Sequence, residues 1–123
     1  MKRDMDLIRE ILLQIEKSQH GWAPDISIVG RTEEEIGYHC FMIVDGGLAN
    51  GQNITAMSDK SPNYIITSLT WEGHDFLDAS RDPGRWSKAK EASSAVGGMT
   101  LDVLKYVLTE MTKNQAMNWL GLS

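Results

Sequence analysis

The chain has 123 residues, of which 41% are hydrophobic and 24% charged, values typical of one soluble globular domain. Its net charge is −5, because 17 acidic residues outnumber 12 basic ones, and this balance disfavours a dedicated nucleic-acid binder. The single cysteine, Cys40, excludes an internal disulfide and fits a reducing compartment. No apolar run approaches the roughly 20 residues that span a bilayer, so we expect a cytoplasmic protein without membrane contact.

The N-terminal segment predicts an amphipathic core helix, with Asp4 in the position of an N-cap. Its apolar residues recur at helical spacing: Leu7, Ile8, Ile11, Leu12 and Ile15. The residues that follow predict a loop over 20–24 and a short strand over 26–29.

A second helix is predicted from Thr32 to about Asp45. Thr32 and Glu35 have the spacing of a capping box, in which each side chain bonds the backbone N–H of the other residue. Gly46 and Gly47 end this helix, and Leu48 is expected to pack back against it. The helical repeat places one set of residues on a common buried face: Ile36, Cys40, Ile43 and Val44.

The central part of the chain predicts an antiparallel β-hairpin followed by a helix. Two β-prone runs, Ile54–Ser58 and Tyr64–Leu69, flank the turn-forming residues 59–63. Thr70 can cap the next helix, which buries Phe76 or Leu77. Together these elements predict an α+β fold.

Two further helices are predicted near the C-terminus. Asp82 and Pro83 have the pattern of a cap followed by proline at the first helical position of a short helix. Thr100 starts the last helix, which carries a seam too short for a convincing coiled coil: Leu101, Leu104, Leu108 and Met111. The tail is unusually apolar, so residues 101–122 are a candidate homodimer contact. The four tryptophans are predicted to be packing anchors: Trp22, Trp71, Trp86 and Trp119.

Three segments between Lys2 and Asp82 are informative as an ordered set. They read KRDMDLIREILLQIE, TEEEIGYHCFMIVDGGL and LTWEGHDFLDASRD, with a weaker match in GGMTLDVLK at 97–105. In this order they resemble the bacterial and phage family known as domain of unknown function 2513. The resemblance implies a small winged-helix-like core and a phage or prophage origin.

The winged-helix interpretation divides a single domain, 1–123, into a core at 1–82 and a C-terminal helical extension at 83–123. One departure concerns the helix that normally lies between the first helix and the recognition helix. Only residues 20–31 are available for it, and they contain Gly21, Pro24 and Gly30. The usual second helix is therefore missing, shortened or replaced by a strand.

The outward stripe of the second predicted helix is the leading candidate for an interaction surface: Glu34, Tyr38, Phe41, Met42 and Asp45. Helices that read DNA grooves use Arg, Lys, Asn and Gln toward bases and phosphates, and this stripe has none of them. Exposed aromatic and methionine side chains ringed by acid favour a protein partner, whose identity stays open. The alternative interpretation is that the C-terminal helices cover the stripe as core.

A DNA-binding transcriptional regulator is the runner-up function. Its candidate phosphate contacts are Arg31, Lys60, Arg81, Arg85, Lys88 and Lys90. The alternative for the stretch from Arg81 to Lys90 is a solvated charged face.

Nothing in the sequence indicates catalysis. His20, His39, His74 and Cys40 are soft metal ligands, but none forms a pair with ligand spacing. Cys40 is expected to be a small buried hydrophobe. Neither glycine pair has the lysine of a phosphate loop, and no serine elbow is present. The sequence therefore predicts a non-enzymatic interaction or regulatory module with no cofactor and no metal.

Overall fold

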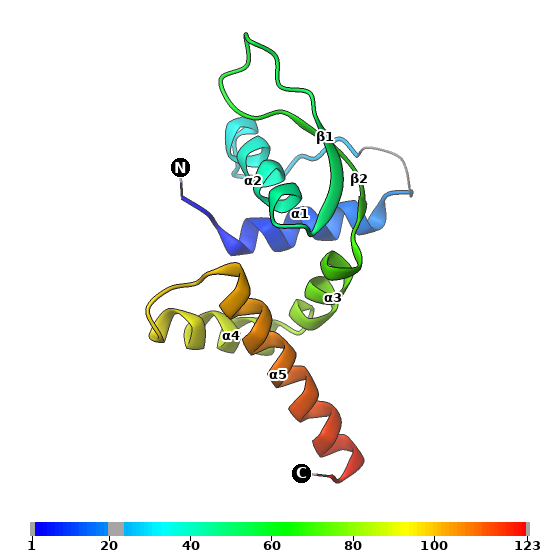
Figure 1. Cartoon of the computed structure of the whole chain (residues 1–123), viewed down its shortest axis with the longest axis vertical. Helices are drawn as coiled ribbons and strands as arrows, with labels where there is room; N and C mark the ends of the chain where they lie inside the picture. Colours follow the sequence, from blue (N-terminus) through cyan, green and yellow to red (C-terminus); the bar gives the residue numbers. More distant parts are fainter. Residues whose placement is uncertain (1, 20–23, 123) are drawn as a thin grey trace. The chain divides into compact units, whose positions relative to one another are not determined.

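The computed structural model describes residues 2–19 and 24–122, which form five helices and one two-stranded antiparallel sheet (Figure 1). This confirms the predicted α+β class with a β-hairpin, whereas the likeness to a winged helix stays a prediction. The chain groups into two compact units that divide between His74 and Asp75. The predicted single domain, with a boundary at 82/83, stays a prediction. In the described ranges no helix is both long enough and apolar enough to cross a bilayer.

The first unit begins with α1 (Met5–Lys17), whose N-terminus is capped as predicted. The Asp4 carboxylate accepts the backbone N–H groups of Asp6 and Leu7 at 3.0 and 3.2 Å. The predicted apolar face is confirmed, because all of its members are buried: Leu7, Ile8, Ile11, Leu12 and Ile15.

The second helix, α2 (Glu33–Asp45), begins at the predicted capping box. Thr32 Oγ1 accepts the N–H of Glu35 at 3.1 Å, and the Glu35 carboxylate accepts the N–H of Thr32 at 3.2 Å. The buried face contains Ile36, Cys40 and Ile43 as expected. It also contains His39, which was not predicted, whereas Val44 is only half-buried.

The end of α2 is a left-handed turn at Gly47, where φ is 78°. The N–H of Gly47 donates to the Val44 carbonyl at 3.1 Å, and the N–H of Leu48 donates to the Ile43 carbonyl at 2.9 Å. These two bonds define the Schellman helix ending, whose left-handed position strongly favours glycine. The side chain of Leu48 is fully buried, as predicted.

The hairpin consists of β1 (Ala49–Asn53) and β2 (Tyr64–Leu69). The prediction for β2 is confirmed, but the prediction of a first strand at Ile54–Ser58 is wrong, because those residues belong to the connecting loop 54–63. The first strand instead begins directly after Leu48, where Ala49 pairs with Leu69, and it ends at Asn53, which pairs with Tyr64. Pairing with β2 therefore outweighs the weak β-propensity of the sequence ANGQN.

The segment between α1 and α2 also differs from expectation. Residues 26–29 are not a strand, because the N–H of Arg31 donates to the Ile28 carbonyl at 3.1 Å across a turn at Gly30, where φ is 83°. Val29 is fully exposed at this turn. Neither 18–19 nor 24–32 contains a helix, in agreement with the predicted departure from a standard winged helix.

The helix α3 (Trp71–Ser80) is joined to the end of α2 through Thr70. As predicted, Thr70 Oγ1 caps α3, accepting the N–H of Gly73 at 3.0 Å, and it also donates to the Gly47 carbonyl at 2.5 Å. The Thr70 N–H donates to the Leu48 carbonyl at 3.1 Å. The same Leu48 carbonyl occupies the space that a Cβ on Gly73 would need, so the close approach requires glycine.

The second unit contains α4 (Pro83–Ala95) and α5 (Leu101–Leu120), which pack against each other. Asp82 caps α4 and Pro83 occupies its first turn, as predicted. Trp86 is buried edge-to-face against Phe76, with ring centroids 5.9 Å apart. Leu77 is fully buried as well, so α3 buries both Phe76 and Leu77, whereas the sequence predicted one or the other.

The last helix is covered along only part of its length. Leu104 and Leu108 of the predicted seam are buried, and every residue from 112 to 122 is exposed, where α5 continues past α4 (Figure 1). The packing prediction is confirmed for Trp86 but wrong for Trp71 and Trp119, which are 82% and 86% exposed. Trp71 is the first residue of α3 and Trp119 lies in the last turn of α5, so neither has a covering element within its own unit. Trp22 lies outside the described residues.

We predict that Gly73→Ala lowers the free energy of unfolding by about 1–3 kcal/mol, because the added methyl group would overlap the Leu48 carbonyl. Glycine-to-alanine changes inside helices normally stabilise by up to about 1 kcal/mol, so the expected sign is reversed. Chemical denaturation followed by circular dichroism measures the effect. Gly84→Ala in α4 is the matched control, since its Cβ would lie 3.7 Å from the nearest atom and should leave stability unchanged or slightly raised. Equal curves for the two variants would contradict the prediction.

Candidate interaction surface on the second helix

The buried side of α2 is fixed to the start of α1 by His39, which is 1% exposed. Its Nε2 accepts the backbone N–H of Asp4 at 2.8 Å, and its Nδ1 lies 2.7 Å from the Glu35 carbonyl. Because Nε2 is an acceptor, the proton must be on Nδ1, which donates to Glu35. Both ring nitrogens are therefore engaged within the protein, which leaves neither available to a metal. The spacing of His39 from Ile36 and Ile43 was the sequence signal for a core position.

A second link between the two helices is formed by Arg31, a candidate phosphate contact in the DNA-binding interpretation. Its Nη2 lies 2.5 Å from Asp4 Oδ2, and its Nη1 lies 3.2 Å from Glu35 Oε2. The guanidinium is therefore already paired with two carboxylates of the same unit, and a phosphate would have to compete with them.

These contacts change the acidity of both carboxyl groups. Partial burial acts to raise the pKa of Asp4, but hydrogen bonds from Arg31 and from the N–H of Leu7 outweigh it and hold this pKa below its ordinary value. The pKa of Glu35 is lowered first by the hydrogen bond from the Thr32 N–H and then by the bond from Arg31. Both groups are thus stabilised in the charged form.

The outward stripe of α2 is only partly covered. Glu34 and Asp45 at its two ends are exposed, whereas Tyr38, Phe41 and Met42 are half-buried. The ring of Phe41 lies 6.3 Å from that of Tyr38 in centroid distance. It also lies 5.8 Å from the ring of Tyr64, a β2 residue that was absent from the predicted surface. The three rings form an aromatic row, defined by Tyr38, Phe41 and Tyr64, that runs from the helix onto the hairpin.

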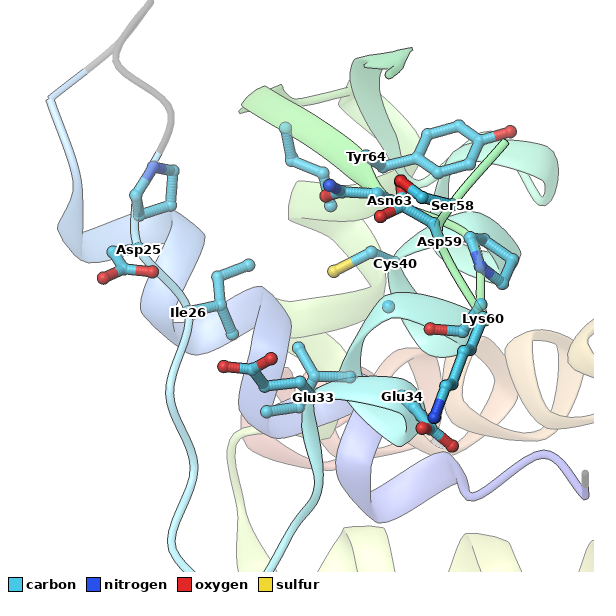
Figure 2. Close-up of a pocket in the computed structure, with 16 residues that line it drawn as sticks. Asp25, Ile26, Glu33, Glu34, Cys40, Ser58, Asp59, Lys60, Asn63 and Tyr64 are labelled. Carbon is cyan, nitrogen blue, oxygen red and sulfur yellow. The ribbon is translucent and has the colours of Figure 1, made fainter. Parts of the chain in front are cut away.

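The loop 54–63 crosses α2 at Gly37, where the Pro62 carbonyl occupies the position of the missing Cβ. Two hollows are lined by residues 59–62 of this loop. The larger, of about 430 Å³, is bordered by residues 24–26 and the first turns of α2 (Figure 2). The smaller, of about 390 Å³, is lined by Phe41 and Tyr64 and therefore adjoins the aromatic row.

The larger hollow is predominantly acidic, because Asp25, Glu33, Glu34 and Asp59 line it together with one cation, Lys60. Figure 2 shows the Lys60 side chain extending across the hollow toward the Glu34 carboxylate. Lys60, another candidate phosphate contact, thus lines a hollow whose other charged side chains are all acidic.

Cys40 also borders the larger hollow, but its thiol is buried (Figure 2). Burial raises the pKa of Cys40 to about 11, so the thiol is protonated at neutral pH and is a poor nucleophile. This agrees with the prediction of a small buried hydrophobe.

The remaining candidate phosphate contacts lie in the second unit, where Arg81 and Arg85 hold the end of α3. Arg81 Nη2 lies 2.9 Å from Asp78 Oδ1. Arg85 Nε donates to the Ala79 carbonyl at 2.7 Å, and its Nη1 donates to the Gln115 side chain. These cations neutralise carbonyls and a carboxylate at the negative end of a helix, which is a structural role.

Lys90 and Lys88 complete the basic stretch. The Lys90 ammonium lies 5.4 Å from the centroid of the Trp86 ring, within the range of a cation–π contact. Lys88 is exposed on α4.

The candidate metal ligands are not brought together. Over the described ranges, no three His, Cys, Asp or Glu side chains are placed to share a metal ion. Asp78, which lies four residues after His74 on α3, pairs with Arg81. His20 lies outside the described residues.

Comparison with known proteins places the chain in a family. Residues 2–100 match the family described as "Hypothetical protein (DUF2513)". The chain belongs to the DUF2513 family. It is also 32% identical over 111 residues to an uncharacterized protein of Haemophilus influenzae, in an alignment that covers 87% of this chain and 92% of that protein. No solved structure matches the chain significantly.

We predict that Arg31→Gln raises the pKa values of Asp4 and Glu35, because it removes a cation that bonds both carboxylates. Because the pKa of each carboxyl group is lower in the folded chain than in the unfolded chain, these groups stabilise the fold at pH values above their ordinary range of about 4. This contribution is lost as the pH falls through the folded-state values. The unfolding free energy of the natural protein should therefore fall more steeply below pH 4 than that of the variant. Carboxyl ¹³C NMR titration and acid denaturation measure the two effects.

Lys60→Gln is the control for loss of one positive charge from the same unit, since Lys60 bonds neither carboxylate. Carboxyl pKa values that are the same in Arg31→Gln and in the natural protein would contradict the assignment of Arg31 as their partner.

Proposed function

We propose that this protein is a non-enzymatic regulatory module of phage or prophage type that binds a protein partner through the outward stripe of α2. The observation that carries the proposal is the partly accessible aromatic row, two of whose three rings lie on α2, a helix that lacks cations. No Lys or Arg occurs from Thr32 to Asn50. Aromatic and methionine side chains are enriched at the centres of protein interfaces, where charged residues are depleted.

The geometry also indicates the chemistry of the partner. The smaller hollow, beside Phe41 and Tyr64, can receive an apolar side chain, as interface anchors usually fill a pocket. The stripe ends in two acids, Glu34 and Asp45, whereas the hollow beside it is lined by one acid and one base, Asp59 and Lys60. An apolar anchor surrounded by basic residues would complement this surface in shape and charge.

The runner-up function, DNA-binding regulation, has one specific observation in its favour. Lys60 is exposed on the loop of a hairpin that follows α2, where a wing would contact a phosphate. Against it, the acids of α2 would oppose phosphate at every DNA sequence. Arg31 and Arg85 are already engaged within the protein.

We predict weak, nonspecific DNA binding at physiological salt, no tighter than the ordinary range of roughly 10⁻⁴ to 10⁻⁶ M. Fluorescence anisotropy with a set of genomic fragments measures the affinity. Nanomolar binding with a strong sequence preference would reject the protein-binding proposal and establish the regulator instead.

We further predict that Phe41→Ala weakens binding of the cognate partner by at least about tenfold, as expected for an interface anchor. A photo-crosslinking residue at position 38 identifies the partner, and calorimetry with the purified pair gives the affinities. Val29→Ala is the matched control, because Val29 is a fully exposed apolar side chain of the same unit outside the stripe. Equal affinities for the two variants, with Phe41→Ala shown to be folded, would show that the stripe is not the interface.

A further inference from the structure

The helix α5 carries a second seam on the side opposite Leu104 and Leu108, which face the core of its unit. Six residues separated alternately by three and four positions form it: Val103, Tyr106, Glu110, Lys113, Met117 and Leu120. This is the spacing of a heptad seam, which keeps one stripe of a helix in contact with a neighbouring helix. It is independent of the α2 stripe.

Three of the four apolar members of this seam are exposed, and the fourth, Val103, is half-buried. Tyr106 is 68% exposed, Met117 is 42% exposed and Leu120 is 59% exposed. A row of large apolar side chains along one face of a helix is a common sign of an interaction site. On α5 the row is interrupted only at its middle, by Glu110 and Lys113, whose charged atoms lie 3.8 Å apart.

The order of residues along the seam indicates which kind of partner would bind there. Two apolar residues are followed by an acid, a base and two more apolar residues. When this order is read backward, apolar positions again meet apolar positions, and the acid meets the base. The seam is therefore complementary to an antiparallel copy of itself in both shape and charge.

We propose that a second copy of this chain docks antiparallel along the seam, with a two-fold axis beside residues 111 and 112. Glu110 then faces Lys113 of the partner subunit, and the same contact occurs a second time because the interface is isologous. Tyr106 faces Met117 of the partner subunit, and Val103 faces Leu120 of the partner subunit. A parallel pair would instead place Glu110 against its own copy, which like charges oppose.

The expected interface is small. A helix of 20 residues is about 30 Å long, and the seam runs along most of it. Contact along one helix lies at the low end of specific interfaces, below about 1,200 Å² in total. We therefore expect a reversible dimer whose population rises over a concentration series from about 1 to 200 μM.

Charge reversal tests the register by sedimentation equilibrium of the full chain. Glu110→Lys alone, or Lys113→Glu alone, places like charges opposite each other twice and should weaken the dimer by at least about tenfold. The double variant with both changes restores opposite charges and should dimerise within about threefold of the natural protein.

The decisive sample is an equimolar mixture of the two single variants. Each chain still carries like charges at positions 110 and 113, but every contact between unlike chains is attractive, so the mixture should form heterodimers. Lys105→Glu, a reversal on α5 outside the seam, is the control and should dimerise normally. Circular dichroism verifies that the helix of each variant is intact.

Three results would overturn the proposal: a natural protein that stays monomeric throughout the series, single variants that dimerise as it does, or a mixture that forms no heterodimer. If a single variant loses helical content, dimerisation of the double variant becomes the test of the register. The double variant restores the charge pair within each chain as well as between chains.

Discussion

The backbone of Leu48 is the point on which the arrangement of the first unit depends. Its N–H closes the end of α2, its side chain is buried, and its carbonyl accepts the N–H of Thr70 while resting against Gly73. One residue thus joins the second helix, the start of the hairpin and the start of the third helix. Two glycines make this possible, Gly47 by its left-handed conformation and Gly73 by its missing Cβ.

Elements set by local chemistry were predictable from the sequence, because their determinants lie within a few residues. The capping box of Thr32 and Glu35, the Gly47 ending and the Asp82 cap all formed where the sequence placed them. The strand β1 was missed because its sequence has low β-propensity, and only its pairing with distant β2 makes it a strand.

The candidate site was predictable to the same extent. Helical periodicity identified the stripe of Tyr38, Phe41 and Met42, and these residues are partly accessible. It could not identify Tyr64 as the third ring of the aromatic row, or the hollow beside it, since both depend on where the loop crosses Gly37. The two partners of Arg31 likewise come from two different helices, so residue spacing along the chain could not predict that they meet.

The buried thiol of Cys40 makes the chain its own reporter of local opening. Burial raises the pKa of Cys40, the only cysteine in the sequence, to about 11, so little of the reactive thiolate is present in the closed state at pH 8. An alkylating reagent can therefore modify the protein efficiently only while local opening around α2 and the neighbouring loop 54–63 exposes this thiol. The rate of that single-site reaction, compared with the rate in denaturant, gives the free energy of this local opening without any engineered label.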